Sequence, residues 1–200
     1  MKSRANPYAK PDAKTLEARA KGYPARSVFK LQEIDRRMRF LRPGQNVLDL
    51  GAAPGSWSLY ASERVGETGH VYAIDIKPIL QVFPDNVQVL IGDALSLTSE
   101  LLAAHAPYDV VMSDMAPNTS GSKLSDQARS TELFLRALDV ALAHGKPGSY
   151  FTGKIFMSGD YKAAEMQVRK AYDSVRTIRP DGTRQQSSEV FVVGIGKRPA

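Results

Sequence analysis

The sequence contains no cysteine among its 200 residues. This absence excludes disulfide bonds, a thiol nucleophile and thiolate metal sites, and it is compatible with the reducing cytoplasm, where we expect the protein. No apolar run approaches the ~20 residues that a membrane span requires, and the first residues lack the apolar stretch of a secretory signal. We therefore expect no association with a membrane.

Histidine is scarce as well, with three residues in the chain: His70, His105 and His144. They fall at a predicted strand entry, a helix end and a helix C-terminus, which indicates surface positions. The sequence shows neither a Ser-His-Asp order nor a cluster with metal-ligand spacing. We expect no bound metal, so the chemistry must depend on other side chains.

The remaining composition is that of an ordinary globular protein, with 42% hydrophobic and 24% charged residues. Two hundred residues suffice for one domain with a substantial core. We expect a single domain over residues 1–200, in which a basic N-terminal arm (1–24) precedes the catalytic core (25–200).

Positive charge is concentrated at the N-terminal end of the chain. Residues 1–42 carry 12 of the 27 lysines and arginines but 4 of the 21 acids, a net charge of +8, whereas residues 43–200 carry a net charge of −2. Such a segment favours a polyanionic partner, and nucleic acid is the usual one. A solvated basic tail is the alternative.

The pattern of apolar residues predicts an α/β fold. A short helix near 14–21 and an amphipathic helix from Ala25 to about Leu41 precede a β/α alternation. Its predicted strands are 46–50, 70–75, 87–91, 109–113, 148–154, 174–179 and 189–195, and its predicted helices are 55–64, 96–104, 126–143 and 160–172. The loop between the last two strands is too short for a helix, so these strands must be antiparallel. The result is the Rossmann-like sheet of methyltransferases, mostly parallel with a reversed last strand and helices on both faces.

The segment from Val47 to Trp57, V-L-D-L-G-A-A-P-G-S-W, combines a buried strand with a glycine-rich turn that opens a helix. Gly51 and Gly55 permit a tight turn and close approach of the backbone to a ligand, and the helix directs free N–H groups into the crevice. The spacing differs from the dinucleotide motif G-x-G-x-x-G, and Pro54 lacks the N–H that a pyrophosphate needs. A ligand without phosphate, such as S-adenosylmethionine, fits better.

Three acids follow successive predicted strands: Asp75, Asp93 and Asp114. The carboxyl ends of parallel strands meet at one edge of a sheet, where ligands bind. We expect Asp75 to accept hydrogen bonds from the ribose of the cofactor and Asp93 from its adenine amino group. One such acid is more often a helix cap, but three beside the glycine turn predict a cofactor pocket.

Five segments of the chain resemble the FtsJ/RrmJ-type RNA ribose 2′-O-methyltransferases, and together they span nearly its full length. They are A-R-S-V-F-K-L from Ala25, the glycine turn itself, S-D-M-A-P-N from Ser113, G-K-I-F from Gly153 and S-E-V-F from Ser188. The resemblance implies a tetrad of catalytic residues (Lys30, Asp114, Lys154 and Glu189) and cofactor contacts by Gly51, Gly55, Trp57, Asp75, Asp93 and Asp114. Two positions depart from the family: Ser56 stands where a second glycine is common, and Gly153 stands where a β-branched residue is common.

The tetrad suggests a mechanism for methyl transfer to a ribose 2′-hydroxyl, which is a poor nucleophile. Alignment of hydroxyl, methyl and sulfur should provide most of the rate, and our hypothesis is that Lys154 removes the proton as a general base. Lys30, as a second ammonium, would favour the neutral form of Lys154 and help to hold the substrate. Asp114 would orient Lys154 and place negative charge near the sulfonium, and Glu189 would position Lys30 or the ribose.

The resemblance and the basic arm together indicate RNA as the substrate. Family members of this compact form methylate a uridine ribose of large-subunit ribosomal RNA, so we expect 23S rRNA within the large ribosomal subunit as the partner. The cofactor would be S-adenosyl-L-methionine, its product S-adenosyl-L-homocysteine, and the protein a monomer. Transfer RNA and mRNA caps are alternative substrates, although no added segment for a cap-base pocket is evident.

Other functional classes fit the sequence less well. An amino-methyltransferase would carry an Asp/Asn-Pro-Pro-aromatic motif after the fourth strand, and the segment starting at Asp114 lacks it. A small-molecule methyltransferase would not need the basic arm. A non-catalytic ribosome assembly factor that binds S-adenosylmethionine is the alternative without chemistry, although all four tetrad side chains are present.

Overall fold

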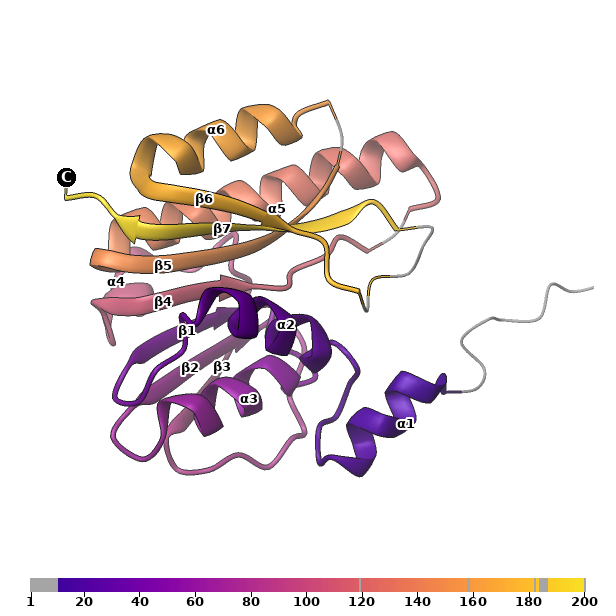
Figure 1. Ribbon diagram of the computed structural model, residues 1–200, viewed down its shortest axis with the longest axis vertical. Coiled ribbons are helices and arrows are strands. Elements are labelled where there is room, and N and C mark those ends of the chain that lie inside the picture. The colour runs from indigo at the N-terminus through magenta and orange to yellow at the C-terminus, as the bar shows by residue number, and fades with distance from the viewer. Residues whose placement is uncertain (1–10, 119, 158, 182, 184–186, 200) are drawn as a thin grey trace, which may run out of the picture.

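The computed structural model describes residues 11–118, 120–157, 159–181, 183 and 187–199. One seven-stranded sheet forms its centre, with the strand order β3-β2-β1-β4-β5-β7-β6 (Figure 1). The strands are β1 (Asn46–Leu50), β2 (His70–Asp75), β3 (Val87–Ile91), β4 (Tyr108–Ser113), β5 (Gly145–Phe156), β6 (Tyr172–Ile178) and β7 (Glu189–Lys197). The helices are α1 (Ala13–Ala20), α2 (Val28–Met38), α3 (Ser56–Val65), α4 (Ser99–Ala103), α5 (Lys123–His144) and α6 (Tyr161–Ala171).

The topology confirms the predicted α/β architecture. Strands β1 to β5 pair in parallel, whereas β7 lies antiparallel between β5 and β6. The chain order reverses between β1 and β4, and such a switch point leaves a crevice at the carboxyl ends of the strands. The site expected from the sequence lies at this edge.

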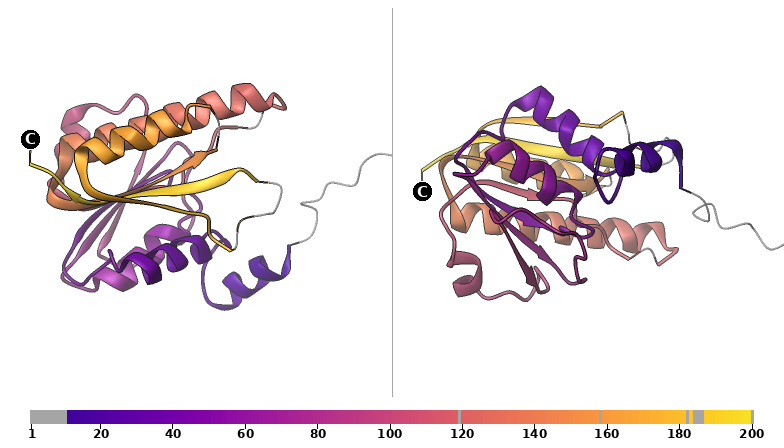
Figure 2. Two further views of the ribbon diagram at one scale, coloured as in Figure 1. Left: turned by 45° about the horizontal axis from the view of Figure 1, so that its top comes forward. Right: turned by 90° about the horizontal axis from the view of Figure 1, so that it is seen from below.

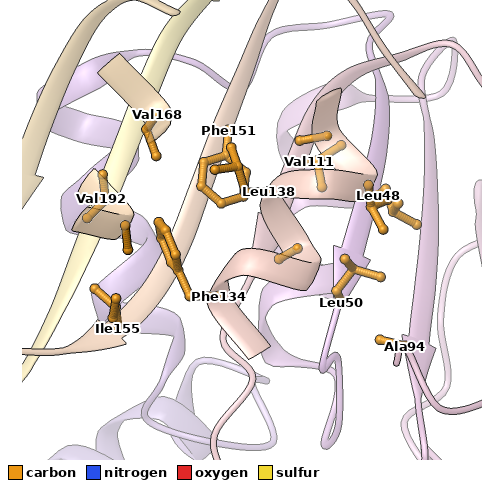
Figure 3. Packing of buried hydrophobic residues seen from close by; sticks show 14 of the residues in the cluster. Leu48, Leu50, Ala94, Val111, Phe134, Leu138, Phe151, Ile155, Val168 and Val192 are labelled. Carbon is orange, nitrogen blue, oxygen red and sulfur yellow. The ribbon is translucent and has the colours of Figure 1, made fainter. Parts of the chain in front are cut away.

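Helices cover both faces of the sheet, with α5 and α6 on one side and α2 and α3 on the other (Figure 2). Figure 3 shows the core on the first side, where Phe134 and Leu138 of α5 pack against Phe151 of β5. A second core lies beneath α2 and α3 and includes Trp57 and Phe191. Both faces of the sheet are apolar because consecutive residues of its central strands are apolar, and successive strand residues point to opposite sides of the sheet.

The helix predicted for 25–41 is shorter at both ends than the sequence suggested, since α2 spans Val28–Met38. It ends because Arg39 adopts the left-handed conformation, with φ of 52°. The apolar periodicity continues beyond the helix because Phe40 and Leu41 are buried in the core without being helical. The predicted helix was therefore too long because the sequence pattern shows that these residues are buried but not that they lie outside the helix.

Most other boundaries agree within two residues, and three elements differ more. Strand β5 starts at Gly145 and not at residue 148, because α5 passes into it without a loop. Helix α5 begins at Lys123, earlier than predicted, with Ser122 as its N-cap. Helix α4 is only five residues long, and it begins after Thr98, whose hydroxyl accepts a hydrogen bond from the Leu101 amide.

The predicted basic arm lies partly outside the described residues, since residues 1–10 are not among them. Within the described part, the short helix near 14–21 is confirmed as α1, which lies at the edge of the molecule (Figure 1). Its buried residue, Ala18, packs with Tyr23 and Val28 in a small separate cluster. No helix in the described part of the chain is long and apolar enough to cross a membrane.

Candidate active site

A cavity of about 230 Å³ opens at the crevice beyond β1, β2 and β4. Its walls come from the end of β2, from the segments that follow β1, β2, β3 and β4, and from α5. The lining residues are Gly51, Ala53, Ile74, Asp75, Ile76, Lys77, Gly92, Ala94, Asp114, Met115, Ala116, Asn118 and Leu133. Two carboxylates and several apolar side chains thus face one space, which suits a ligand with both polar and apolar parts.

Gly51 lies where two of these turns touch. Its φ is +79°, and a Cβ placed on it would lie 2.5 Å from Cγ of Met115 and 3.0 Å from the Met115 Cα and backbone nitrogen. A side chain at this position would push the β1 turn away from the β4 turn. Glycine is required here because the two turns together form the cavity wall.

Gly55 shapes the same turn from its other end, although it does not line the cavity. It is the N-cap of α3 with φ of 108°, and a Cβ would approach Phe83 to 2.8 Å. The segment between β2 and β3 therefore packs directly on this glycine. Because α3 starts beside the turn, its first amide groups have no acceptor within the helix and carry partial positive charge.

The acids predicted to hold a cofactor occupy different environments. Asp75 lines the cavity, and its carboxylate accepts hydrogen bonds from the amides of Ala53 (2.8 Å) and Lys77 (2.8 Å). Each of its oxygens has a further lone pair for a ligand hydroxyl. Asp93 lies between two lining residues, but its own side chain is exposed and accepts from the amide of Leu95.

Lys154 and Asp114 form the first pair of the predicted tetrad. The ammonium of Lys154, on β5, donates to the backbone oxygen of Asp114 (2.6 Å) and to its carboxylate (3.0 Å). The Lys154 side chain is 5% exposed and that of Asp114 17%. Asp114 also lines the cavity, so one residue joins the cavity to the buried lysine.

Lys30 and Glu189 form the second pair. Lys30 Nζ of α2 lies 2.6 Å from the Glu189 carboxylate of β7, and both side chains are largely buried. The same ammonium lies 5.8 Å from the ring centroid of Phe191, a favourable cation–π distance. Phe191 is the register partner of Lys154 across β5 and β7. Directly opposed side chains share a face of the sheet, so both lysines lie on the α2 side.

Trp57, which the sequence predicts as a cofactor contact, is not among the residues that line the cavity. The indole is buried, stacks near Phe191 with ring centroids 5.5 Å apart, and donates to the backbone oxygen of Ser27 (2.9 Å). It lies on the face of α3 that meets the segment before α2. The side chain therefore supports the helix that carries Lys30.

Ser56 fixes the same segment by a reciprocal contact. Its hydroxyl accepts from the amide of Ala25 (2.8 Å) and donates to the carbonyl of Ala25 (3.1 Å). This hydroxyl exists because serine replaces the glycine common in the family. The other departure is also explained by packing: a Cβ on Gly153 would lie 2.9 Å from the Phe134 ring.

Asp49 is a buried acid whose role the sequence did not indicate. Its side chain is fully buried in β1, and one carboxylate oxygen accepts from the Ser58 hydroxyl (2.6 Å), while the other has no partner among the described residues. Burial raises its pKa to about 7, against the effect of the Ser58 hydrogen bond, and the nearby carboxylates of Asp114 and Asp75 add to the rise. Its place in the motif was visible, but its burial depends on α3 covering the strand.

The histidines are not part of this arrangement. His70 and His105 are exposed and His144 is partly exposed; His105 stacks on Tyr72 with centroids 3.8 Å apart. The described residues contain no group of three or more histidines and acids able to hold a metal ion. The predicted tetrad instead forms two ion pairs, Lys154 with Asp114 and Lys30 with Glu189.

Comparisons with known proteins identify the family of the chain. The family described as FtsJ-like methyltransferase matches residues 23–197. The chain is 60% identical to the ribosomal RNA large subunit methyltransferase E of Sorangium cellulosum over 98% of this chain and 92% of the relative. The protein of the same name from Oleidesulfovibrio alaskensis is 47% identical over 90% of this chain and 89% of the relative.

A solved structure shares the fold. A Plasmodium falciparum chain named as a ribosomal RNA methyltransferase superposes with a TM-score of 0.77 at 22% identity, covering 89% of this chain and all of that one. At this identity the likeness concerns the arrangement of the sheet and its helices.

Proposed function

Because the chain belongs to the FtsJ-like methyltransferase family, we propose that it transfers a methyl group from S-adenosyl-L-methionine to a ribose 2′-hydroxyl of RNA. The proposed substrate is a uridine of 23S rRNA in the large ribosomal subunit, which accords with the names of the most similar relatives. The observation that carries the proposal is the contact of Asp114 with both the cavity and Lys154. It joins the proposed cofactor pocket to the buried side chain of Lys154.

The cavity residues fit S-adenosylmethionine. The glycine at position 51 lets the turns after β1 and β4 meet as one wall of the cavity, and Asp75 retains lone pairs for ribose hydroxyls. Apolar walls from Ile74 and Leu133 suit an adenine. The N-terminal amides of α3 favour a carboxylate. Asp93 remains a proposed acceptor for the adenine amino group, and Trp57, at the end of the glycine turn, remains a proposed cofactor contact.

The cofactor supplies an electrophilic methyl group on a positively charged sulfur. In the proposed reaction the 2′-oxygen would take the methyl group as the carbon–sulfur bond breaks, S-adenosyl-L-homocysteine would leave, and the hydroxyl proton would pass to Nζ of Lys154. In-line alignment of the two reactants provides a large part of the acceleration. The protein must therefore hold the ribose and the amine in a fixed relation.

The two hydrogen bonds from Lys154 explain how the amine is aimed. A neutral amine has two N–H bonds and one lone pair, and the carbonyl and carboxylate of Asp114 accept from both N–H bonds. The lone pair then points away from Asp114, toward the remaining tetrahedral direction. In this proposal Asp114 orients the base as well as placing negative charge at the cavity.

Lys30 is proposed to hold the substrate from the other side of the site. Its ammonium is fixed by Glu189 and by the Phe191 ring, so a phosphate or ribose oxygen meets a cation that is already in position. We further propose that the chain acts as one domain, as a monomer, in the cytoplasm. A non-catalytic assembly factor would not need two buried lysine–carboxylate pairs.

The deciding experiment is methyl transfer from labelled S-adenosylmethionine to large ribosomal subunits and to total tRNA, both from cells lacking this protein. Mapping of 2′-O-methyl sites would follow. We expect label on large-subunit RNA with the wild type and none with Lys154→Ala. Label on tRNA alone would overturn the rRNA substrate, and no label on either RNA despite bound cofactor would overturn the enzymatic proposal.

A further inference from the structure

A groove lined by arginines lies on the α2 side of the protein, apart from the cofactor cavity. It has a volume of about 450 Å³ and is formed by the end of α2, the turn that follows it, and α3. We call it the arginine groove; its lining residues are Asp35, Arg36, Arg39, Leu41, Arg42, Pro43, Tyr60 and Arg64. We propose that it binds backbone phosphates of the RNA substrate at nucleotides away from the methylated ribose.

The groove carries a large excess of positive charge. Four arginines line it against one acid, Asp35. That carboxylate is buried and already accepts from the Leu41 amide, the Tyr60 hydroxyl and the Arg64 guanidinium. It neutralises Arg64 in part and offers nothing to the other three arginines, so the groove attracts an anion.

Two of the arginines are held rigidly by neighbouring groups. Arg64 donates to Asp35 (3.2 Å). Arg42 donates to the carbonyl of Arg39 (3.2 Å) and lies over the Tyr150 ring at 5.9 Å, with a further bond to its hydroxyl. A cation that is positioned in advance loses less side-chain entropy when it binds a phosphate.

The other two arginines, Arg36 and Arg39, are exposed and have no hydrogen-bond or ion-pair acceptor for their guanidinium groups within the described residues. Among the residues that the structure describes, Arg39 is the one non-glycine residue whose backbone adopts the left-handed conformation. Glycine is preferred at this helix-end position.

The position of the groove fits a substrate longer than the reacting nucleotide. Lys30 and Met38 lie at opposite ends of α2, eight residues apart, which corresponds to about 12 Å along the helix. That span equals a few nucleotides at a rise of roughly 3.4 Å per nucleotide in a helical strand. Phosphate contacts of this kind position a nucleic acid without reading its sequence.

An alternative explanation is purely structural, since arginines near a helix C-terminus stabilise the helix dipole. The two explanations predict opposite effects of Arg39→Gly. If Arg39 stabilises the helix, this variant lowers the melting temperature. If Arg39 binds RNA, the variant keeps or raises the melting temperature, because glycine suits the left-handed backbone, while RNA binding weakens.

The test measures binding of the full chain to transcribed large-subunit rRNA by filter binding between about 50 and 200 mM salt. The test variant is Arg36→Gln with Arg39→Gly. The matched control is Arg169→Gln with Lys170→Gln, which removes two charges from α6 on the opposite face of the sheet. For the groove variant we expect roughly tenfold weaker binding and a log–log salt slope smaller by about 0.7–0.9 per arginine.

The outcomes separate this inference from the proposed function, on which it rests for the choice of RNA. A drop in affinity limited to the groove variant, without loss of thermal stability, supports it, and methyl transfer should then show a raised KM with kcat retained. The inference would be overturned if RNA affinity fell equally in the groove variant and the control variant, or if it did not change in the groove variant. It would also be overturned if inorganic phosphate displaced the RNA equally well from the wild type and from the groove variant. RNA binding is measured without cofactor, so an absence of methyl transfer would count against the proposed function alone.

Discussion

The hydroxyl of Ser56 is bonded to both backbone groups of Ala25, accepting from its amide at 2.8 Å and donating to its carbonyl at 3.1 Å. The contact joins the glycine-rich turn, from which α3 starts, to the segment that leads into α2. Lys30 is in the first turn of α2. The serine therefore relates the position of the cofactor turn to that of a proposed substrate-binding lysine.

We expect Ser56→Ala to lower both stability and catalysis. The variant leaves the Ala25 amide and carbonyl without their partner, which costs about 1–3 kcal/mol when such groups are buried, and it frees the start of α2. Urea unfolding and methyl-transfer kinetics measure the two effects, with Ser99→Ala, at the exposed start of α4, as control. Unchanged kinetics in Ser56→Ala would show that this contact does not position Lys30.

We expect Lys154→Arg to lower kcat by about 10²–10⁴, the usual contribution of a general base. Arginine can still donate to Asp114, but it stays protonated and cannot accept the hydroxyl proton. Single-turnover methyl transfer at saturating RNA checks this, together with a calorimetric measurement of cofactor binding. Lys162→Arg, at an exposed position on α6, is the control. Turnover near that of the wild type would exclude Lys154 as the base.

Glu189→Gln should destabilise the protein by roughly 1–3 kcal/mol, because the largely buried Lys30 ammonium loses its carboxylate partner at 2.6 Å. Adding Lys30→Met removes the unpaired charge and should recover part of that stability without recovering activity. Urea unfolding of the single and double variants gives the coupling between the two residues. Strictly additive changes would mean that the ion pair makes no net contribution.

Asp49→Asn should change how stability depends on pH. The folded pKa of Asp49 is about 7, above the ordinary value of 3.8, so the folded protein binds this proton more tightly than the unfolded chain. The associated stability is complete below pH 3.8 and is lost as the pH rises toward about 7.

Asparagine cannot ionise and can still accept from Ser58, so the variant should be more stable than the wild type above pH 7 by up to about 4 kcal/mol at 1.36 kcal/mol per pKa unit. Urea unfolding across this pH range is the measurement. Asp139→Asn, at an exposed position on α5, should follow the wild-type profile. If the stability of Asp49→Asn depended on pH in the same way as that of the wild type, the inferred titration of Asp49 would be contradicted.

The strands and their order were predictable because their signals are local. A buried run followed by a glycine turn marks β1, and the short connection before β7 forces an antiparallel pair. The end of α2 was not predictable, because Arg39 has no sequence signal for a left-handed backbone and the residues after it continue the apolar period. The carboxyl-end positions of Asp75 and Asp114 followed from topology alone.

The finer geometry of the site depends on contacts between distant segments. The family resemblance grouped Lys30, Asp114, Lys154 and Glu189, and the proposed mechanism already paired Asp114 with Lys154 and gave Glu189 either Lys30 or the ribose. The distances and the burial of the two pairs depend on strand register. The inward position of Trp57 likewise depends on how α3 meets the segment before α2. A single sequence contains no local signal for either relationship.

The placement of β7 has a consequence for how the enzyme is made. This strand is the last of the seven to be synthesised, yet it lies between β5 and β6 and brings Glu189 and Phe191 to the site. A nascent chain that ends before residue 189 has every cavity-lining residue but leaves the edge of β5 unpaired and Lys30 without its carboxylate. The Lys30–Glu189 pair therefore forms only after the turns that line the cavity have all been synthesised.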